Sequence, residues 1–332
     1  MKYEGKGDKM AIKWGVLGTA GIAQGCTIPG MQTAEGCELY AIAGRNETKV
    51  NEFKKRFGFQ KAYVGYDALL ADEEVQAVYI PLPNHLHHEW VMKAIEAGKH
   101  VLCEKPLALN ALEAEEMFRA AKRKGVQFAE AYAYLHSPYV ASLREVIESG
   151  SIGTVDYIET AFVTQGYEED YRLHKEFGGG AMYDLGCYCT TMMLSLVDSE
   201  PTFVKACAEF GGDDVDFNTA GIVRFENGVR ASFNVGMIFG KGANGRFDRL
   251  YIHGSKGCIR SEVEYNQAGE LSYRVMTNGK EEVKTVTARQ NYCLEVEQMN
   301  RAIEGKGELL VTPEFSLRNA KLMDAVLREI EY

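Results

Sequence analysis

IKWGVLGTAGIA, residues 12–23, is the stretch that decides the fold: a short apolar run, a turn of small residues and the start of a helical pattern. Small side chains at such a turn let the backbone approach a pyrophosphate and aim the helix N-terminus at it. Ala20 and Ala23 stand where a strict G-x-G-x-x-G pattern has its second and third glycines, and an ordinary strand-to-helix turn is the alternative. We expect a dinucleotide to bind here through Gly18, Thr19, Ala20, Gly21 and Ile22.

Short apolar runs and helical patterns alternate from residue 12 to about residue 130, which predicts a parallel, doubly wound sheet. The unbroken hydrophobicity of residues 77–82 is typical of a strand covered on both faces. After Gly150, runs rich in β-branched and aromatic residues follow one another between hairpin signals such as Asn227-Gly228. The sequence therefore predicts an α/β fold class: an N-terminal Rossmann sheet and a C-terminal α+β domain with a large, mostly antiparallel open sheet.

The length and charge of the chain narrow its class. At 332 residues it has room for about two domains. We place a polar extension at residues 1–10, a Rossmann domain at residues 11–150 and the α+β domain at residues 151–332. A net charge of −10 without a basic run disfavours nucleic acid as a partner. The chain contains no run of about 18 apolar residues that could span a membrane, and its start is too polar for a signal peptide, so we expect a cytoplasmic protein.

The cysteine and histidine patterns predict no metal site. The eight cysteines are scattered without a CxxC pair, unlike a disulfide scaffold or a structural zinc site, and we interpret them as reduced thiols. His85, His87 and His88 could suggest a metal, but they begin a predicted helix, and no acidic or cysteine ligand is spaced to complete a set.

The end of the second predicted strand bears on the choice of dinucleotide. An acidic side chain there would bind the ribose 2′-hydroxyl of NAD, but residues 43–46 read AGRN and contain Arg45 instead. A guanidinium is suited to a 2′-phosphate. We therefore expect NADP to be favoured, and NAD is the alternative cofactor if Arg45 is only a solvated residue at the start of a helix.

Polar residues follow later strands of the predicted parallel sheet, at the edge where ligands bind in open α/β folds. Residues 81–88 read PLPNHLHH and residues 104–106 read EKP. His87 either lines the pocket or caps its helix. We expect this edge to contribute cofactor contacts from Pro81, Asn84, His87, Glu104 and Lys105.

Four motifs occur in one order along the chain: GVLGTAGIA at residues 15–23, P-N-x-x-H at residues 83–87, EKP at residues 104–106 and GGGAMYDLGCY at residues 178–188. With these motifs the chain resembles the glucose-fructose oxidoreductase and inositol dehydrogenase (Gfo/Idh/MocA) family over nearly its whole length. It is most similar to the branch that contains dimeric dihydrodiol dehydrogenase and NADP-dependent D-xylose 1-dehydrogenase. That branch has Tyr where the inositol dehydrogenases have His, and this chain has Tyr188.

The resemblance implies three catalytic residues: Lys105 as the family's catalytic lysine, Asp184 as the pocket acid after the triple glycine, and Tyr188 as the acid/base. The chemistry of the residues agrees. Asp184 and Tyr188 are four residues apart on one predicted helix and share a face, and a lysine ammonium nearby would favour the phenolate. Tyr188 could then remove a hydroxyl proton as hydride leaves the same carbon for the nicotinamide. Each residue taken alone could equally be structural.

Aromatic and polar residues elsewhere are candidates for binding the substrate. Tyr132 follows a predicted strand and could contact a sugar or pack between the domains. Tyr171 belongs, with Tyr167, Arg172 and His174, to a polar loop that could close over the substrate. We expect substrate contacts from Lys105, Tyr132, Tyr171, Asp184 and Tyr188.

The leading hypothesis is an NAD(P)-dependent oxidoreductase that acts on a sugar or a related polyhydroxylated alcohol or carbonyl. Two alternatives use the same fold: an NAD-dependent glycosidase that oxidises its substrate transiently, and a sensor that binds a sugar or dinucleotide without catalysis. A sensor needs no proton relay, so Lys105, Asp184 and Tyr188 disfavour it. The resemblance also implies a homodimer that is joined face to face through the C-terminal sheet.

The interpretation of Arg45 predicts that catalytic efficiency with NADP exceeds that with NAD by roughly 10-fold or more. Each factor of 10 corresponds to a free-energy difference of about 1.4 kcal/mol. Arg45→Asp should reverse this order, because a carboxylate repels the 2′-phosphate and accepts from the 2′-hydroxyl. Steady-state kcat/KM with each cofactor measures the effect. A wild-type protein that uses NAD as well as NADP would contradict the interpretation.

Overall fold

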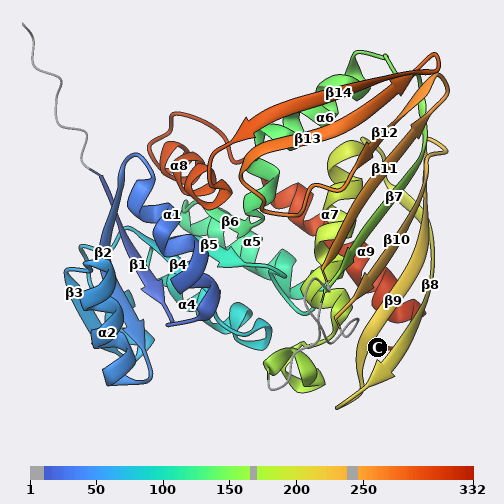
Figure 1. Ribbon diagram of the computed structural model, residues 1–332. Coiled ribbons are helices and arrows are strands. Elements are labelled where there is room, and N and C mark those ends of the chain that lie inside the picture. Colours follow the sequence, from blue (N-terminus) through green and yellow to red (C-terminus); the bar gives the residue numbers. More distant parts are fainter. Residues whose placement is uncertain (1–10, 165–169, 238–245) are drawn as a thin grey trace, which may run out of the picture.

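The computed structural model describes residues 11–164, 170–237 and 246–332, in which two β-sheets lie side by side with helices between and around them (Figure 1). The predicted N-terminal extension, residues 1–10, and the candidate lid residue Tyr167 lie outside the described residues. No described helix has both the length and the apolar character needed to cross a membrane. All eight cysteines are free thiols.

The first sheet is parallel, and its strands are short and apolar. All four residues of β4 are buried, as expected of a strand covered on both faces. The strand order β3-β2-β1-β4-β5-β6 places the change of winding direction between β1 and β4, which is the order of the Rossmann fold and confirms the predicted sheet. The strands are β1 (Ile12–Leu17), β2 (Cys37–Gly44), β3 (Lys61–Val64), β4 (Ala77–Ile80), β5 (His100–Glu104) and β6 (Phe128–Ala131).

Helices on the first sheet begin and end at the residues that local chemistry favours. Asn46 and Asn110 accept from the backbone N–H three residues on and cap α2 (Glu47–Phe57) and α5 (Ala111–Lys124). The same helices end at Gly58 and Gly125, which adopt φ of +81° and +70°. The other elements of this half are η1 (Ala23–Thr27), α1 (Ile28–Thr33), α3 (Tyr66–Leu70), η2 (Asn84–Leu86), α4 (His87–Glu96), η3 (Ala133–His136) and α6 (Pro138–Glu148).

The second sheet has the order β14-β13-β12-β11-β7-β10-β9-β8. Its neighbours are antiparallel except for β7 and β10, which run parallel, so the prediction of a mostly antiparallel sheet is confirmed. The hairpin of β13 and β14 was not predicted, although Asn278-Gly279 forms its turn. The strands are β7 (Val155–Val163), β8 (Pro201–Gly211), β9 (Val215–Phe225), β10 (Arg230–Gly236), β11 (Phe247–Gly254), β12 (Gly257–Ser261), β13 (Gly269–Thr277) and β14 (Lys280–Ala288).

Helices from the second half cover both sheets. The buried helix α7 (Cys187–Leu196) and α9 (Pro313–Glu329) lie between the second sheet and the first, and the opposite face of the second sheet carries no described helix (Figure 1). Helix α8 (Asn291–Ile303) returns to α1, and its Val296 packs in the same core as Trp14. The second half thus completes the core of the first, while the domain boundary at residues 150–153 stays a prediction. The remaining elements are η4 (Tyr171–Leu173), η5 (Lys175–Phe177) and η6 (Met182–Gly186).

Candidate active site

The glycine-rich turn opens onto the carboxyl edge of the first sheet. The backbone of Gly18 has φ of +133°, and a Cβ there would lie 3.2 Å from Leu82 Cδ2, so a glycine keeps the turn close to the neighbouring loop. A helix begins at Gly21, which is exposed and has no neighbouring atom in the space where a Cβ would stand. The first turn of this helix, next to Thr19, Ala20 and Ile22, therefore offers accessible backbone N–H groups, as an anion site requires.

Arg45 follows the last residue of β2 and is exposed at the same edge. It lies beside Tyr66, where burial raises the pKa of the phenol and the Arg45 charge opposes that rise. The guanidinium therefore lies beside α3, at the carboxyl end of β2. This position is compatible with contact to the ribose end of a dinucleotide whose pyrophosphate lies at Gly21.

Lys105 follows β5 and joins the first sheet to the helical segment η6. Its Nζ donates to the backbone oxygen of Asp184 at 2.8 Å and to Asp184 Oδ1 at 3.1 Å. Arg172 Nε lies 2.9 Å from the same Oδ1, so the carboxylate of Asp184 contacts two cations. Burial, the largest single influence, lowers the pKa of Lys105, but the charge of Asp184 together with smaller contributions from Tyr188 and Cys187 makes the net shift upward. Lys105 is therefore a fixed ammonium rather than a base.

Tyr188 lies beside that ammonium, on the first turn of α7. Lys105 Nζ is 4.9 Å from the centroid of the Tyr188 ring. Burial raises the pKa of the Tyr188 phenol well above its usual range, and the charge of Lys105 acts in the opposite direction. Four further aromatic rings surround the Tyr188 ring, with centroids 5.1 to 5.9 Å from its own, and form an aromatic cage: Tyr132, Tyr134, Phe162 and Tyr265.

The helix that carries Asp184 and Tyr188 begins with a wider turn than the predicted α-helix would have. Asp184 belongs to a π-helical segment, and α-helical geometry begins at Cys187. Asp184 and Tyr188 nevertheless both reach Lys105. The structure therefore brings together the three residues that the sequence assigned to catalysis.

Asp216, at the start of β9, holds the beginning of this helix and was missed in the sequence. Its Oδ2 accepts from the backbone N–H of Met182 at 2.8 Å and from the Thr219 hydroxyl at 2.5 Å. Gly180 has φ of +97°, and a Cβ there would lie 2.1 Å from Asp216 Oδ1. The triple glycine thus lets the chain pass against a buried carboxyl. Because Asp216 lies 36 residues or more from that turn, no local pattern marks it.

Two residues of the P-N-x-x-H motif fasten loops to one another. Asn84 Nδ2 donates to Gly178 O at 2.7 Å and so links the first sheet to the triple glycine. His87 is fully buried, with Nδ1 2.8 Å from Pro106 O and Nε2 2.7 Å from Leu82 O. Burial lowers the pKa of His87 to about 4, so the ring is neutral and donates to one of the two carbonyls. The side chain of His87 thereby ties the loop after β4 to the loop after β5.

The other candidate residues lie around this centre. Tyr132 is fully buried, and its hydroxyl accepts from Asn319 Nδ2 at 3.1 Å. Glu104 is also buried and accepts from Tyr79 at 2.5 Å. Tyr171 is partly buried with its ring 4.6 Å from the Arg172 guanidinium carbon, beside Asp184. Pro81 lies near Gly18, 3.8 Å from the position of a Cβ on that residue.

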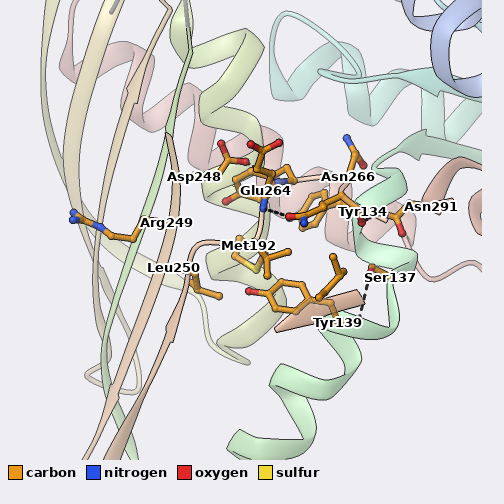
Figure 2. A pocket seen from close by; sticks show the side chains of 14 residues that line it. Tyr134, Ser137, Tyr139, Met192, Asp248, Arg249, Leu250, Glu264, Asn266 and Asn291 are labelled. Carbon is orange, nitrogen blue, oxygen red and sulfur yellow. Dashed lines mark hydrogen bonds between the residues drawn. The ribbon is translucent and has the colours of Figure 1, made fainter. Parts of the chain in front are cut away.

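Figure 2 shows a cavity next to this centre, with Asp248, Glu264 and Asn266 along one side and Ser137 and Tyr139 along the other. Its volume of about 20 Å³ is on the scale of one ordered water rather than of a sugar. Two of its residues, Tyr134 and Tyr265, also belong to the cage around Tyr188. Among the described residues, no three His, Cys, Asp or Glu side chains are grouped so that they could hold a metal ion.

Comparison with known proteins finds two family descriptions that match this chain. Residues 12–132 match the family described as "Oxidoreductase family, NAD-binding Rossmann fold". Residues 140–260 match the GFO/IDH/MocA C-terminal domain. The two matches together span most of the chain.

Relatives match it over almost their full lengths. An uncharacterised oxidoreductase of Rhizobium meliloti is 34% identical, with 96% of this chain and 97% of the relative covered. An NADP(+)-dependent D-xylose 1-dehydrogenase of Haloferax volcanii is 30% identical, with 96% of this chain and 98% of the relative covered. The crystal structure of a 3-ketoreductase from Actinomadura kijaniata, in complex with NADP and TDP-benzene, superposes with a TM-score of 0.90 at 28% identity and covers 96% of this chain and 98% of that one.

The buried carboxyl of Asp216 predicts a pH dependence of stability. Burial raises its pKa to about 7 from an ordinary 3.8, so the folded chain holds this proton more tightly than the unfolded chain. Below about pH 4 both states are protonated and the group costs nothing. As the pH rises toward 7 only the unfolded state loses the proton, so stability is lost. The side chain of Asp216→Asn cannot titrate. The Tm of this variant relative to that of wild type should therefore rise by about 2 °C or more from pH 4.5 to pH 7.5.

Thermal unfolding at several pH values measures this difference. Asp198→Asn, at an exposed residue after α7, is the matched control and should track the wild type at every pH. A difference in Tm between Asp216→Asn and wild type that is constant or shrinks as the pH rises would show that the carboxyl is already ionised in the folded protein.

Proposed function

The chain belongs to the Gfo/Idh/MocA oxidoreductase family, and from this premise we propose that it transfers hydride between NADP and a sugar or a related polyhydroxylated alcohol or carbonyl. The observation that carries the proposal is the ammonium of Lys105, held between Asp184 and the Tyr188 ring at the carboxyl edge of a Rossmann sheet. A buried cation beside a phenol at this edge has the chemistry of a proton-transfer site. The NADP-dependent xylose dehydrogenase and the NADP-bound ketoreductase among the relatives support the choice of substrate class and cofactor.

The residues of the first sheet are suited to hold NADP. Residues 18–22 would bind the pyrophosphate through the exposed start of the helix at Gly21. Arg45 would contact the 2′-phosphate, which favours NADP over NAD. Pro81, Asn84 and Glu104 border the place of the nicotinamide, and His87 acts by holding the two loops together. The nicotinamide supplies the hydride acceptor or donor.

Tyr188 moves the proton. In oxidation its phenolate oxygen accepts the proton of the substrate hydroxyl, and in reduction its phenol donates a proton to the alkoxide. The positive charge of Lys105 lowers the free-energy cost of forming the Tyr188 phenolate, a cost that burial raises. Asp184 orients the lysine through two contacts to Nζ, and Arg172 shares the charge of that carboxylate. Tyr171, which is only partly buried, would contribute a wall of the substrate site beside these groups, whereas the fully buried Tyr132 packs against the Tyr188 ring.

Replacement of the proton-transfer residues tests the proposal. Tyr188→Phe and Lys105→Ala should each lower kcat by on the order of 100-fold or more, because general acid/base catalysis is lost. NADP affinity, measured by quenching of intrinsic fluorescence, should change little. The assay follows NADPH formation with D-xylose, D-glucose and a dihydrodiol.

Two surface variants are matched controls: Tyr63→Phe on β3 and Lys93→Ala on α4 should retain wild-type turnover. A Tyr188→Phe protein with wild-type kcat would contradict the role of the phenol. Sustained formation of NADPH from a free sugar distinguishes a dehydrogenase from a glycosidase that recycles its nicotinamide in place.

We also propose that the chain forms a homodimer through the second sheet. The outer face of this sheet carries exposed apolar side chains, with Ile222 53% and Phe247 44% exposed. Ser232 and Asn234 alternate on β10 with the buried Phe233, so this face is mixed rather than fully polar. A broad exposed sheet of this character is typical of a protein interface.

Light scattering at micromolar concentration should therefore give twice the chain mass of 37.0 kDa, with an interface of about 2,000 Å² or more. Ile222→Lys places a charge on the outer face and should shift the protein toward the monomer. Val64→Lys changes an equally exposed apolar residue on the first sheet and should leave the dimer intact. A stable wild-type monomer at this concentration would rule out the proposed assembly.

A further inference from the structure

The turn between β12 and β13 brings an asparagine to the hydroxyl of Tyr188. Asn266 Nδ2 lies 3.4 Å from Tyr188 Oη and is placed to donate to it. The residue is 78 positions away from Tyr188 in the chain and belongs to none of the four sequence motifs. The phenol oxygen therefore has an amide on one side, in addition to the Lys105 ammonium beside its ring.

The backbone of Asn266 is in the left-handed region, with φ of +64°. The neighbouring structure holds it there. Tyr265 N–H donates to Asp248 Oδ2 at 2.7 Å, and Arg246 binds both oxygens of the same carboxylate while donating to Tyr265 O at 2.9 Å. An ion pair between Arg246 and the buried carboxylate of Asp248 thus fixes the turn from behind.

The other end of the amide has no hydrogen-bond partner in the part of the chain that the structure describes. Asn266 Oδ1 is buried and accepts no hydrogen bond from the described residues. A buried polar atom without a partner costs about 1–3 kcal/mol. A group from a ligand would remove this cost if it donated a hydrogen bond to Oδ1. Because Nδ2 is directed at the phenol, such a ligand group would lie next to the one that reacts with Tyr188.

Asparagine is also a residue that tolerates positive φ, and that alone could account for its presence in a turn. Asn278, with φ of +51° in the β13–β14 hairpin, is such a case. Asn266 differs from Asn278 in two respects. Its amide nitrogen contacts the acid/base residue, and its amide oxygen is buried and unsatisfied. Neither property is needed for a turn.

We propose that Asn266 is a further catalytic residue, whose amide N–H stabilises the phenolate of Tyr188 and whose amide oxygen accepts a substrate hydroxyl adjacent to the reacting carbon. The proposal rests on the function proposed above and narrows its substrate class to vicinal diols, a class that includes aldoses. The amide exchanges no proton: Tyr188 takes the hydroxyl proton, the C–H electron pair leaves as hydride to the nicotinamide, and Asn266 only donates to one oxygen and accepts from another.

Asn266→Gly separates the two explanations because glycine adopts positive φ without strain and removes only the amide. Asn278→Gly is the matched control. The contact to Tyr188 is measured without substrate, by ¹³C NMR of protein labelled at tyrosine Cζ, with the Tyr188 resonance assigned by its loss in Tyr188→Phe. We expect Asn266→Gly to shift this resonance and Asn278→Gly to leave it in place. Both variants should unfold at or above the wild-type Tm.

Kinetics then test the two hydrogen bonds. With NADP and D-glucose, Asn266→Gly should lower kcat by about 10-fold or more, while Asn278→Gly should not. Wild type should use 2-deoxy-D-glucose at least about 10-fold less efficiently than D-glucose, because Oδ1 is then left without a donor, and Asn266→Gly should lose this discrimination.

The outcomes distinguish failure of this inference from failure of the proposed function. An unshifted Tyr188 resonance in Asn266→Gly overturns the inference, whether or not D-glucose is a substrate. Unchanged kcat, or the same discrimination against the 2-deoxy sugar in variant and wild type, overturns it as well. A wild-type protein that oxidises no sugar or diol contradicts the proposed function, and the NMR result still decides whether the amide binds the phenol.

Discussion

The contact between Lys105 and Asp184 joins the edge of the first sheet to the helix that carries Tyr188. The two residues are 79 positions apart, and their side chains are only 12% and 7% exposed. A buried ion pair adds little net stability when intact, but loss of one partner leaves a buried charge at a cost of about 3–5 kcal/mol. The pair therefore fixes the register between the two halves of the molecule. It also places a positive charge against the Tyr188 ring, which opposes the rise in the pKa of the phenol that burial causes.

Several contacts keep this pair in place, and they come from distant parts of the chain. Asp216 on β9 accepts from the Met182 N–H at the start of the helical segment that contains Asp184, and Asn84 on η2 binds the triple glycine from the side of the first sheet. His87 ties together the loops after β4 and β5. The site is thus held by rigid elements at each of its borders, which is what general acid/base chemistry requires of groups that must lie within hydrogen-bond reach of a substrate.

Local patterns in the sequence predicted the parts of this structure that depend on neighbouring residues. The glycine-rich turn, the strands of the first sheet and the long helices follow from periodicity and capping, and a helix was predicted at Asp184 and Tyr188. The hairpin of β13 and β14 could have been found from Asn278-Gly279 between two alternating runs. Asp216 and Asn266 could not, because each matters through a contact made across the fold, to Met182 and to Tyr188. The π-helical segment η6 was likewise not predicted, and its first residue, Met182, donates to Asp216 from a distant part of the chain.

The crystal structure of the protein with NADP and a bound sugar tests the central claim most directly. Our account predicts one substrate hydroxyl within about 2.6–3.2 Å of Tyr188 Oη, with Lys105 Nζ next to it and the hydrogen-bearing carbon facing C4 of the nicotinamide. A complex in which the sugar hydroxyl contacts a different side chain, with Tyr188 Oη turned away from both the sugar and the nicotinamide, would contradict the account.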